Sequence, residues 1–163
     1  MIGNAAPESD VSLERTERQT EALVVIVDDD VSVRESLAAL VSSAGWQVLT
    51  FASARAFLDQ PRSSRPGCLV LDVSLPDLNG LEVQERLSQE KSALPIIFIT
   101  GRGDVPMSVR AMKAGAIEFL TKPVEADVLL AAITEAVENS VAAIEANSVR
   151  ERVRDGDAPL TGR

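Results

Sequence analysis

Four short apolar runs of the sequence are each followed closely by a side chain that could handle a metal ion or a phosphate. These side chains are Asp28, Asp29 and Asp30 after the first run, Asp72 after the third, Thr100 after the fourth and Lys122 after the fifth. In open parallel sheets, ligands bind beyond the carboxyl ends of the strands. If the runs are parallel strands, these groups converge on one edge of a sheet.

The chemistry of this set follows from its charges. Carboxylates brought within a few ångströms of one another repel and raise one another's pKa unless a cation lies between them. Mg²⁺ takes one or two carboxylates, keeps several waters and leaves positions for phosphate oxygens. Lys122 and Thr100 would complement the remaining phosphate oxygens by charge and hydrogen bond. The set therefore indicates phosphoryl transfer to a carboxylate, with Asp72 as the candidate nucleophile.

Composition excludes several other functions. The 163 residues include 16 Lys+Arg, 25 Asp+Glu and no His, for a net charge of −9. An acidic surface argues against direct binding of nucleic acid, which needs a basic face. The lack of histidine removes Ser-His-Asp and Cys-His nucleophilic sites and His-ligated zinc. With 45% hydrophobic residues, the chain can form one compact domain with tails.

The single cysteine and the lack of a long apolar segment indicate in which part of the cell the protein works. Cys68 has no second cysteine to pair with and lies in an apolar run, so we expect a buried core residue in a reducing compartment. No stretch of about 18 apolar residues is present to span a membrane. We therefore expect a cytoplasmic protein that makes no membrane contact.

Alternating elements predict the fold class. The apolar runs lie at 23–27, 48–51, 68–71, 96–99 and 117–120, and each has the length of a strand. Most are apolar on both faces, which is typical of parallel strands covered by helices. Helical patterns follow them, with caps expected at Asp30 and Ser53 and ends at Gly45 and Gly115. The pattern predicts a right-handed (βα)5 three-layer sandwich of the α/β class.

Both ends of the sequence lack this pattern. Residues 1–20 have no apolar periodicity and are expected to form a flexible arm. An amphipathic stretch after Pro123 extends to Ile144, and residues 148–163 are expected to form a linker, because Gly156, Pro159 and Gly162 would interrupt a helix. The predicted organisation is an arm at 1–20, a domain at 21–140, and a helix extension with a tail at 141–163.

Three segments together resemble a known family. VIVDDD at 25–30, LVLDVSLPDLNGLE at 69–82 and IIFITGRGDVPMSVRAMKAGAIEFLTKP at 96–123 are similar to the receiver domains of two-component response regulators, and closely to the FixJ-type subgroup. The similarity covers residues 23–139. It implies a flavodoxin-like doubly wound fold with a five-stranded parallel sheet in the order 2-1-3-4-5. It also implies signalling rather than enzymatic turnover, with a histidine kinase as phosphodonor.

The resemblance assigns roles to matching residues. Asp28 and Asp29 match the acidic pair that holds Mg²⁺, for which Mn²⁺ or Ca²⁺ could substitute, and Asp72 matches the phosphoacceptor that also binds the metal. Ser74 would offer its backbone carbonyl to the ion. Thr100 matches the hydroxyl residue that follows the phosphoryl group. Further matches are the switch aromatic Phe119, the phosphoryl-binding Lys122, and Pro123, whose preceding peptide bond is expected to be cis.

The sequence departs from the subgroup pattern at three places. Arg102 stands where His is usual, Val124 follows Pro123 where Phe is usual, and Ser74-Leu75 replaces the frequent Arg-Met pair. None of these changes removes a group needed for phosphorylation. Ser74 and Arg102 flank the site and are expected to tune the lifetime of the acyl phosphate.

Phosphorylation is expected to change the surface formed by the fourth helix, the fifth strand and the fifth helix. On this face, the candidate dimer or partner contacts are Met107, Arg110, Met112 and Lys113. For the methionines, ordinary core packing is an equally good interpretation. The output is expected to be transcription, through a domain absent from this chain or through a partner. The final residues 160–163 resemble the start of a helix-turn-helix domain, which makes truncation of a longer regulator one hypothesis.

Other functions remain in competition at this point. The chain could be a stand-alone receiver, or a scaffold that works without phosphorylation. A flavodoxin-like nucleotide-binding module would need a Gly-rich or hydroxyl-rich loop after the first strand, where three aspartates stand instead. A phosphatase with a carboxylate nucleophile would normally place a second aspartate two residues after the first, where Ser74 stands.

Overall fold

The computed structural model describes residue 17, residues 19–101 and residues 105–154. Strands and helices alternate along this part of the chain. The strands are β1 (Leu23–Val27), β2 (Gln47–Phe51), β3 (Gly67–Asp72), β4 (Ile96–Thr100) and β5 (Glu118–Thr121). The helices are α2 (Val31–Ser43), α3 (Ala54–Leu58), α4 (Gly80–Gln89), α5 (Val105–Lys113) and α6 (Ala126–Arg154).

All five strands form one parallel sheet in the order β2-β1-β3-β4-β5, which confirms the predicted fold and strand order. The central strands β3 and β4 are buried along their whole length. The edge strands differ from the expectation of strands covered on both faces. β2 has only half-buried and exposed residues, and β5 ends exposed, because each has a neighbour on one side only.

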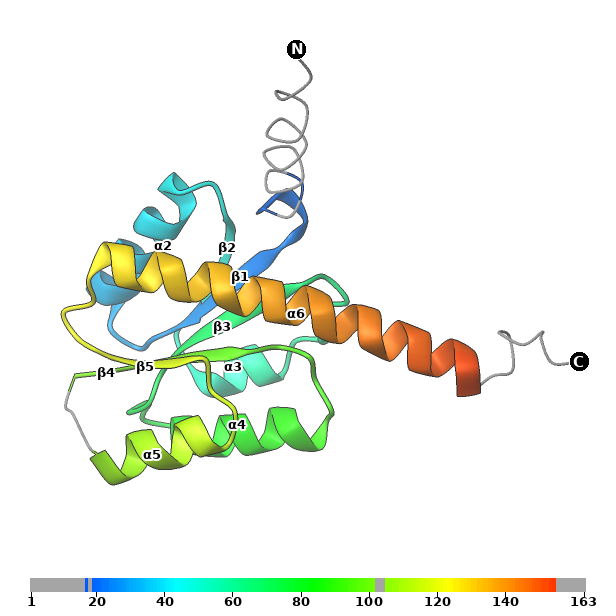
Figure 1. The fold of residues 1–163 in the computed structure, drawn as a ribbon. Coiled ribbons are helices and arrows are strands. Elements are labelled where there is room, and N and C mark those ends of the chain that lie inside the picture. Colours follow the sequence, from blue (N-terminus) through cyan, green and yellow to red (C-terminus); the bar gives the residue numbers. More distant parts are fainter. Residues whose placement is uncertain (1–16, 18, 102–104, 155–163) are drawn as a thin grey trace, which may run out of the picture.

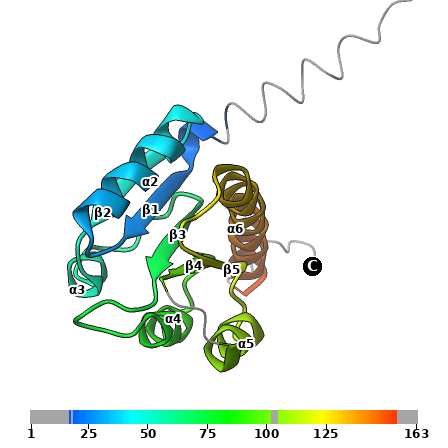
Figure 2. The same ribbon diagram turned by 90° about the vertical axis from the view of Figure 1, so that its left-hand side faces the viewer.

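Two helical layers cover the sheet, as Figures 1 and 2 show. On one face, Leu37 and Val41 of α2 and Ile133 of α6 pack against alternate residues of β1, β3 and β4. On the other face, α3, α4 and α5 pack on the intervening residues, with Phe57 and Val83 in the contact. Period-two alternation along the strands thus produces two separate core clusters.

Local signals in the sequence define where helices begin. The Asp30 side chain accepts hydrogen bonds from the backbone of Ser32 and Val33, and Ser53 does the same for Ala56. Asn79, which the sequence analysis did not single out, forms a capping box with Glu82 at the start of α4.

Glycines end two of the helices at the predicted positions. Gly45 and Gly115 follow α2 and α5, with φ angles of 101° and 103°. Other residues rarely adopt this region of backbone space, so glycine allows the chain to leave the helix there.

Helix α6 is longer than predicted. It was expected to give way to a linker at Ser148, but it continues to Arg154. The expected helix breakers, Gly156 and Pro159, lie beyond Arg154, and polar residues alone do not end a helix. Most of the predicted arm at 1–20 and the last part of the tail lie outside the described residues.

The single cysteine lies in the core, as expected from its apolar neighbours. Cys68 is fully buried in β3, and burial raises the pKa of its thiol to about 12. Among the helices that the structure describes, none is long and apolar enough to cross a membrane.

We predict that Gly67→Ala destabilises the fold. Gly67 pairs with Leu23 at the start of β3, where an added Cβ would lie 2.1 Å from the Leu23 carbonyl oxygen. Forcing the strands apart should lower the free energy of unfolding by about 1–3 kcal/mol, measured by urea denaturation. Gly101→Ala is the matched control, since its Cβ would meet nothing within 4 Å. Equal stability of the two variants would contradict the prediction.

Candidate functional site

Neighbouring strand ends bring three carboxylates together. Asp28 directly follows β1 and Asp72 ends β3, and these two strands are paired in the middle of the sheet. Asp28 and Asp72 are buried, whereas Asp29 is exposed. One oxygen from each of the three aspartates lies within 4.8 Å of the others. The residues expected to surround a cation are therefore adjacent in space.

Lys122 lies opposite these carboxylates. It follows β5, and its Nζ is 3.0 Å from Oδ2 of Asp28 and 3.0 Å from Oδ2 of Asp72. Its backbone N–H donates to the carbonyl of Thr100 at 2.8 Å. Because β4 lies between β3 and β5, the lysine side chain must extend past the end of β4 to reach both aspartates. One cation thus links the ends of β1, β3 and β5.

Burial and neighbouring charges shift the pKa values of this group. Burial raises the pKa of Asp28 above its usual value, although a hydrogen bond from the Asp30 backbone and the nearby Lys122 act in the opposite direction. For Lys122, burial alone would lower the pKa. The carboxylates of Asp28 and Asp72, each 3.0 Å from Nζ, prevail and raise the pKa of the lysine above its usual value.

The contacts of the two Asp28 carboxylate oxygens indicate whether a metal ion fits among the three aspartates. Its Oδ1 accepts the backbone N–H of Asp30 at 2.9 Å. Its Oδ2 is buried and makes an ion pair with Lys122, but it accepts no well-oriented hydrogen bond from the described part of the chain. Mg²⁺ takes carboxylate oxygens as ligands, and Asp28, Asp29 and Asp72 each bring one such oxygen to within 4.8 Å of the others. These residues fit a hard divalent cation.

Asp72 is held at both carboxylate oxygens. Its Oδ1 accepts the backbone N–H of Ser74 at 2.9 Å, and its Oδ2 accepts from Nζ of Lys122. Ser74 is exposed and forms an isolated antiparallel bridge with Asn79, just before α4. The loop after β3 therefore orients the Asp72 side chain through its own backbone.

The remaining predicted site residues lie along β4 and β5. Thr100 ends β4 and is 3% exposed. Phe119 of β5 is half-buried, and its ring centroid lies 5.8 Å from that of Phe98. The peptide bond between Lys122 and Pro123 is cis. Arg102, predicted to tune the site, lies outside the described residues.

Helix α5 carries the predicted interface residues with unequal exposure. Met112 is 43% exposed, and Arg110 and Lys113 are exposed as well. Met107 is partly buried and packs against the core cluster on the face covered by α3, α4 and α5. Its contacts are therefore those of a core residue. The exposed part of the predicted face thus lies toward the end of α5.

Two residues that support the site were missed in the sequence. The Arg34 guanidinium donates to the backbone carbonyl of Asp28 at 2.7 Å, and the Asp77 carboxylate accepts the backbone N–H groups of Ala54 and Arg55. Burial would raise the pKa of Asp77, but the backbone N–H groups around its carboxylate, led by those of Arg55 and Ala54, together lower it. Nothing in the position of either residue along the sequence distinguishes it from an ordinary surface charge.

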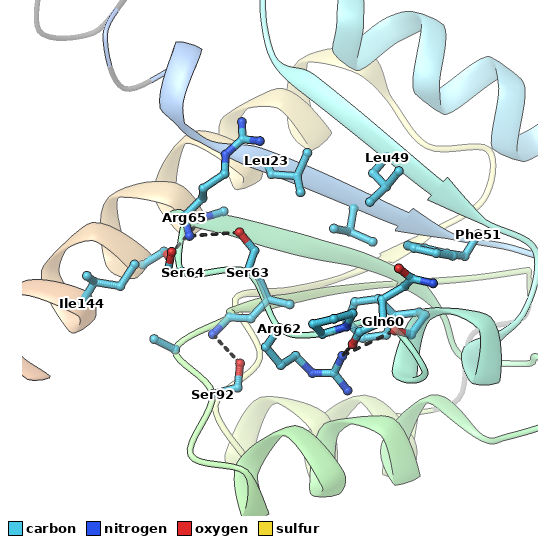
Figure 3. Close-up of a pocket in the computed structure, with 17 residues that line it drawn as sticks. Leu23, Leu49, Phe51, Gln60, Arg62, Ser63, Ser64, Arg65, Ser92 and Ile144 are labelled. Carbon is cyan, nitrogen blue, oxygen red and sulfur yellow. Dashed lines mark hydrogen bonds between the residues drawn. The ribbon is translucent and has the colours of Figure 1, made fainter.

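A cavity of about 140 Å³ lies at the other edge of the sheet (Figure 3). Alternate residues of β1 and β2, including Leu23 and Leu49, line it together with the loop that contains Arg62 and Arg65. Both guanidinium groups are engaged, Arg62 with Glu90 and Arg65 with Gln47. None of the three clustered aspartates lines this cavity, so it is separate from the carboxylate cluster.

Fold and site together define a signalling module of the CheY-like type. The chain belongs to the response regulator receiver domain family, whose model matches residues 24–134. It is 50% identical over 123 residues to nodulation protein W of Bradyrhizobium diazoefficiens, covering 76% of this chain and 54% of that protein.

Two solved structures agree with this assignment. Response regulator StyR superposes with a TM-score of 0.79 and 46% identity, over 88% of this chain and 72% of that chain. Full-length FixJ from B. japonicum gives a TM-score of 0.69 and 41% identity, over 82% and 66%. The similarity to FixJ-type regulators is therefore confirmed. The chain spans about half the length of the first curated relatives it matches.

We predict that Mg²⁺ raises the melting temperature of the protein through the carboxylate cluster, because an ion that binds only the folded state stabilises it. Asp28→Asn should reduce this rise, since it removes a charge from the cluster, whereas Asp59→Asn at the exposed end of α3 should retain it. Differential scanning calorimetry across a Mg²⁺ titration measures the effect. An equal rise in all three proteins would contradict it.

The effect should also depend on pH. Because the pKa of Asp28 is raised in the folded protein, protons compete with Mg²⁺ at a higher pH than for an ordinary aspartate. In the metal-free protein, the same shift makes Asp28 favour folding as the pH falls through its folded-state pKa. The stabilisation by Mg²⁺ should therefore shrink in mildly acidic buffer.

Proposed function

We propose that this chain is a phosphorylation-activated receiver that accepts a phosphoryl group from a histidine kinase on Asp72. The supporting observation is the position of Asp72, whose carboxylate lies close to those of Asp28 and Asp29 and 3.0 Å from Nζ of Lys122. A carboxylate so placed has a nearby positive charge for an incoming phosphate and ligands for a divalent ion. Membership of the response regulator receiver domain family supports this proposal.

The proposed step is transfer between two covalent carriers. A carboxylate oxygen of Asp72 attacks the phosphorus of a phosphohistidine, the new O–P bond forms, and the N–P bond breaks. The imidazole nitrogen keeps the electron pair of the broken bond and takes up a proton. Mg²⁺, when bound, would neutralise charge on the phosphoryl oxygens. Lys122 would exchange part of its contact with Asp72 for those oxygens, and the Ser74 N–H orients the nucleophile.

The same geometry argues against the competing functions. Three aspartates beyond β1 would repel the phosphates of a nucleotide that bound there without a metal ion. A phosphatase of the carboxylate type needs an acid near Asp72 to protonate the leaving group, and the second residue after Asp72 is the exposed Ser74. We therefore expect transfer to Asp72 and slow hydrolysis, with no turnover of a small substrate. Ser74 and Arg102 would set the rate of that hydrolysis.

The proposed signal passes from Thr100 to the surface of α5, β5 and α6. A phosphoryl group adds about −1.5 to −2 charges at neutral pH, and its oxygens would attract the Thr100 hydroxyl. Thr100 and Thr121 are paired neighbours on β4 and β5, and Phe119 lies two residues before Thr121. Movement of Thr100 toward Asp72 would open space for the Phe119 ring and bias an existing equilibrium between two arrangements.

The partners follow from this account. A histidine kinase is the proposed donor, in the cytoplasm, and the phosphorylated chain would pair with a second copy or an output module through exposed α5 residues such as Met112. The match covers only about half of nodulation protein W and of response regulator TmoT. By analogy with the transcriptional regulator FixJ, we propose control of transcription, through a domain beyond this chain or a partner protein.

We predict that the protein gains one base-labile phosphoryl group when it is incubated with acetyl phosphate and Mg²⁺. Intact-mass spectrometry before and after mild base measures the gain. Asp72→Asn should abolish it, because the amide is a poor nucleophile. Asp59→Asn, at the exposed end of α3, is the control and should be phosphorylated normally. Retention of the phosphoryl group in Asp72→Asn would contradict the site assignment.

We also predict that Thr100→Val separates phosphorylation from its structural effect. The variant keeps the size of the side chain but lacks the hydroxyl, so Asp72 should still be phosphorylated. Amide chemical-shift changes in α5 and β5, measured by NMR with and without acetyl phosphate, should fall to a small fraction of those in the unmodified sequence. Unchanged shifts in the variant would show that Thr100 does not carry the signal.

A further inference from the structure

The last part of α6 carries an exposed apolar stripe. Figure 1 shows that this helix continues well past the edge of the sheet. Its exposed apolar positions there, which we call the α6 stripe, are Ala142, Ala146, Val149 and Val153. Val149 is 51% exposed and Val153 63%. Two valines on a protruding helix are a feature that packing within the domain does not explain.

The α6 stripe lies on the side of the helix that faces away from the domain. Leu129, Ile133 and Val137 are buried against the sheet, and Ile144 continues that face as a partly buried residue. On a helix of 3.6 residues per turn, the stripe falls on the opposite side from these residues. A partner could therefore reach the stripe without displacing α6 from its own sheet.

The spacing of the stripe matches a coiled-coil seam. Its members are separated by four, three and four residues, the alternation of a and d positions in a heptad repeat. Such a seam is typical of two helices packed side by side over their length. The stripe therefore favours another helix as its occupant.

The charges beside the stripe favour a second copy of the same helix in parallel orientation. Glu145 precedes the seam position Ala146, and Arg150 follows the seam position Val149. In a parallel dimer, a g residue faces the e residue five positions further on in the partner. Glu145 would then face Arg150 of the partner subunit, twice by symmetry. Within one helix, residues five apart are not neighbours, so this complementarity has no intramolecular use.

Acidic residues limit how far the contact can extend. Glu135 and Glu138 occupy the exposed side of α6 over the sheet. Two copies brought together there would place like charges close to one another. The seam therefore begins only after Glu138, in the last part of the helix.

We propose that a second copy of this chain docks on the α6 stripe as a parallel two-stranded coiled coil, independently of phosphorylation. The contact is separate from the exposed end of α5 and does not depend on the chemistry of Asp72. It would hold two receivers at a fixed spacing, with their α5 surfaces free.

The first test measures self-association of the full chain without Mg²⁺ or phosphodonor, by sedimentation equilibrium. We expect a concentration-dependent dimer. Val149→Glu and Val153→Glu should each raise its dissociation constant roughly tenfold or more, because they place two charges in the seam. Ser148→Glu, exposed but off the seam, is the matched control and should leave it unchanged. Circular dichroism verifies that every variant keeps its helix content.

A second test checks the orientation. Glu145→Arg and Arg150→Glu should each weaken the dimer, and the double variant should restore it. A monomer at all concentrations overturns the proposal, as does a dimer insensitive to the valine variants but lost in Met112→Glu. Weakening by Glu145→Arg without any effect of Arg150→Glu would overturn the parallel arrangement.

Discussion

The contact of Lys122 with two buried aspartates is the interaction on which the site depends. Asp28 and Asp72 are negative groups at the ends of paired strands, and burial makes their charge costly unless a cation lies nearby. Lys122 reaches them from the far side of β4 at 3.0 Å from each. This is possible only if the strands are parallel and their ends lie at one level. The order and register of the sheet are thus prerequisites for the chemistry.

Much of the fold was predictable because the apolar runs of strand length, the helical patterns between them and the helix caps all indicate the same order of elements. The apolar runs match β1 to β5 within a residue or two, and Asp30 and Ser53 cap helices as expected. The exposure of β2 was not predictable from its composition, since an edge position depends on strand order rather than on local sequence. The length of α6 was underestimated because the helix breakers expected to end it, Gly156 and Pro159, lie beyond its last residue, Arg154.

The site was predictable in its residues but not in its contacts. The strand ends indicated that Asp28, Asp72 and Lys122 would converge, and the structure places them together. The sequence contains no signal for the second oxygen of Asp28, which is left with an ion pair and no hydrogen bond. Arg34 was missed for a related reason, because a contact with a backbone carbonyl has no signature in residue type.

The burial of Cys68 has a practical consequence for following conformational change. It is the only thiol in the 163 residues, and the core of β3 encloses it completely. Its raised pKa keeps it in the unreactive thiol form. A cysteine introduced elsewhere on the surface could therefore carry a spin label or a fluorophore without background labelling. The native cysteine therefore does not have to be removed before labels are attached for distance measurements between protomers or across a moving helix.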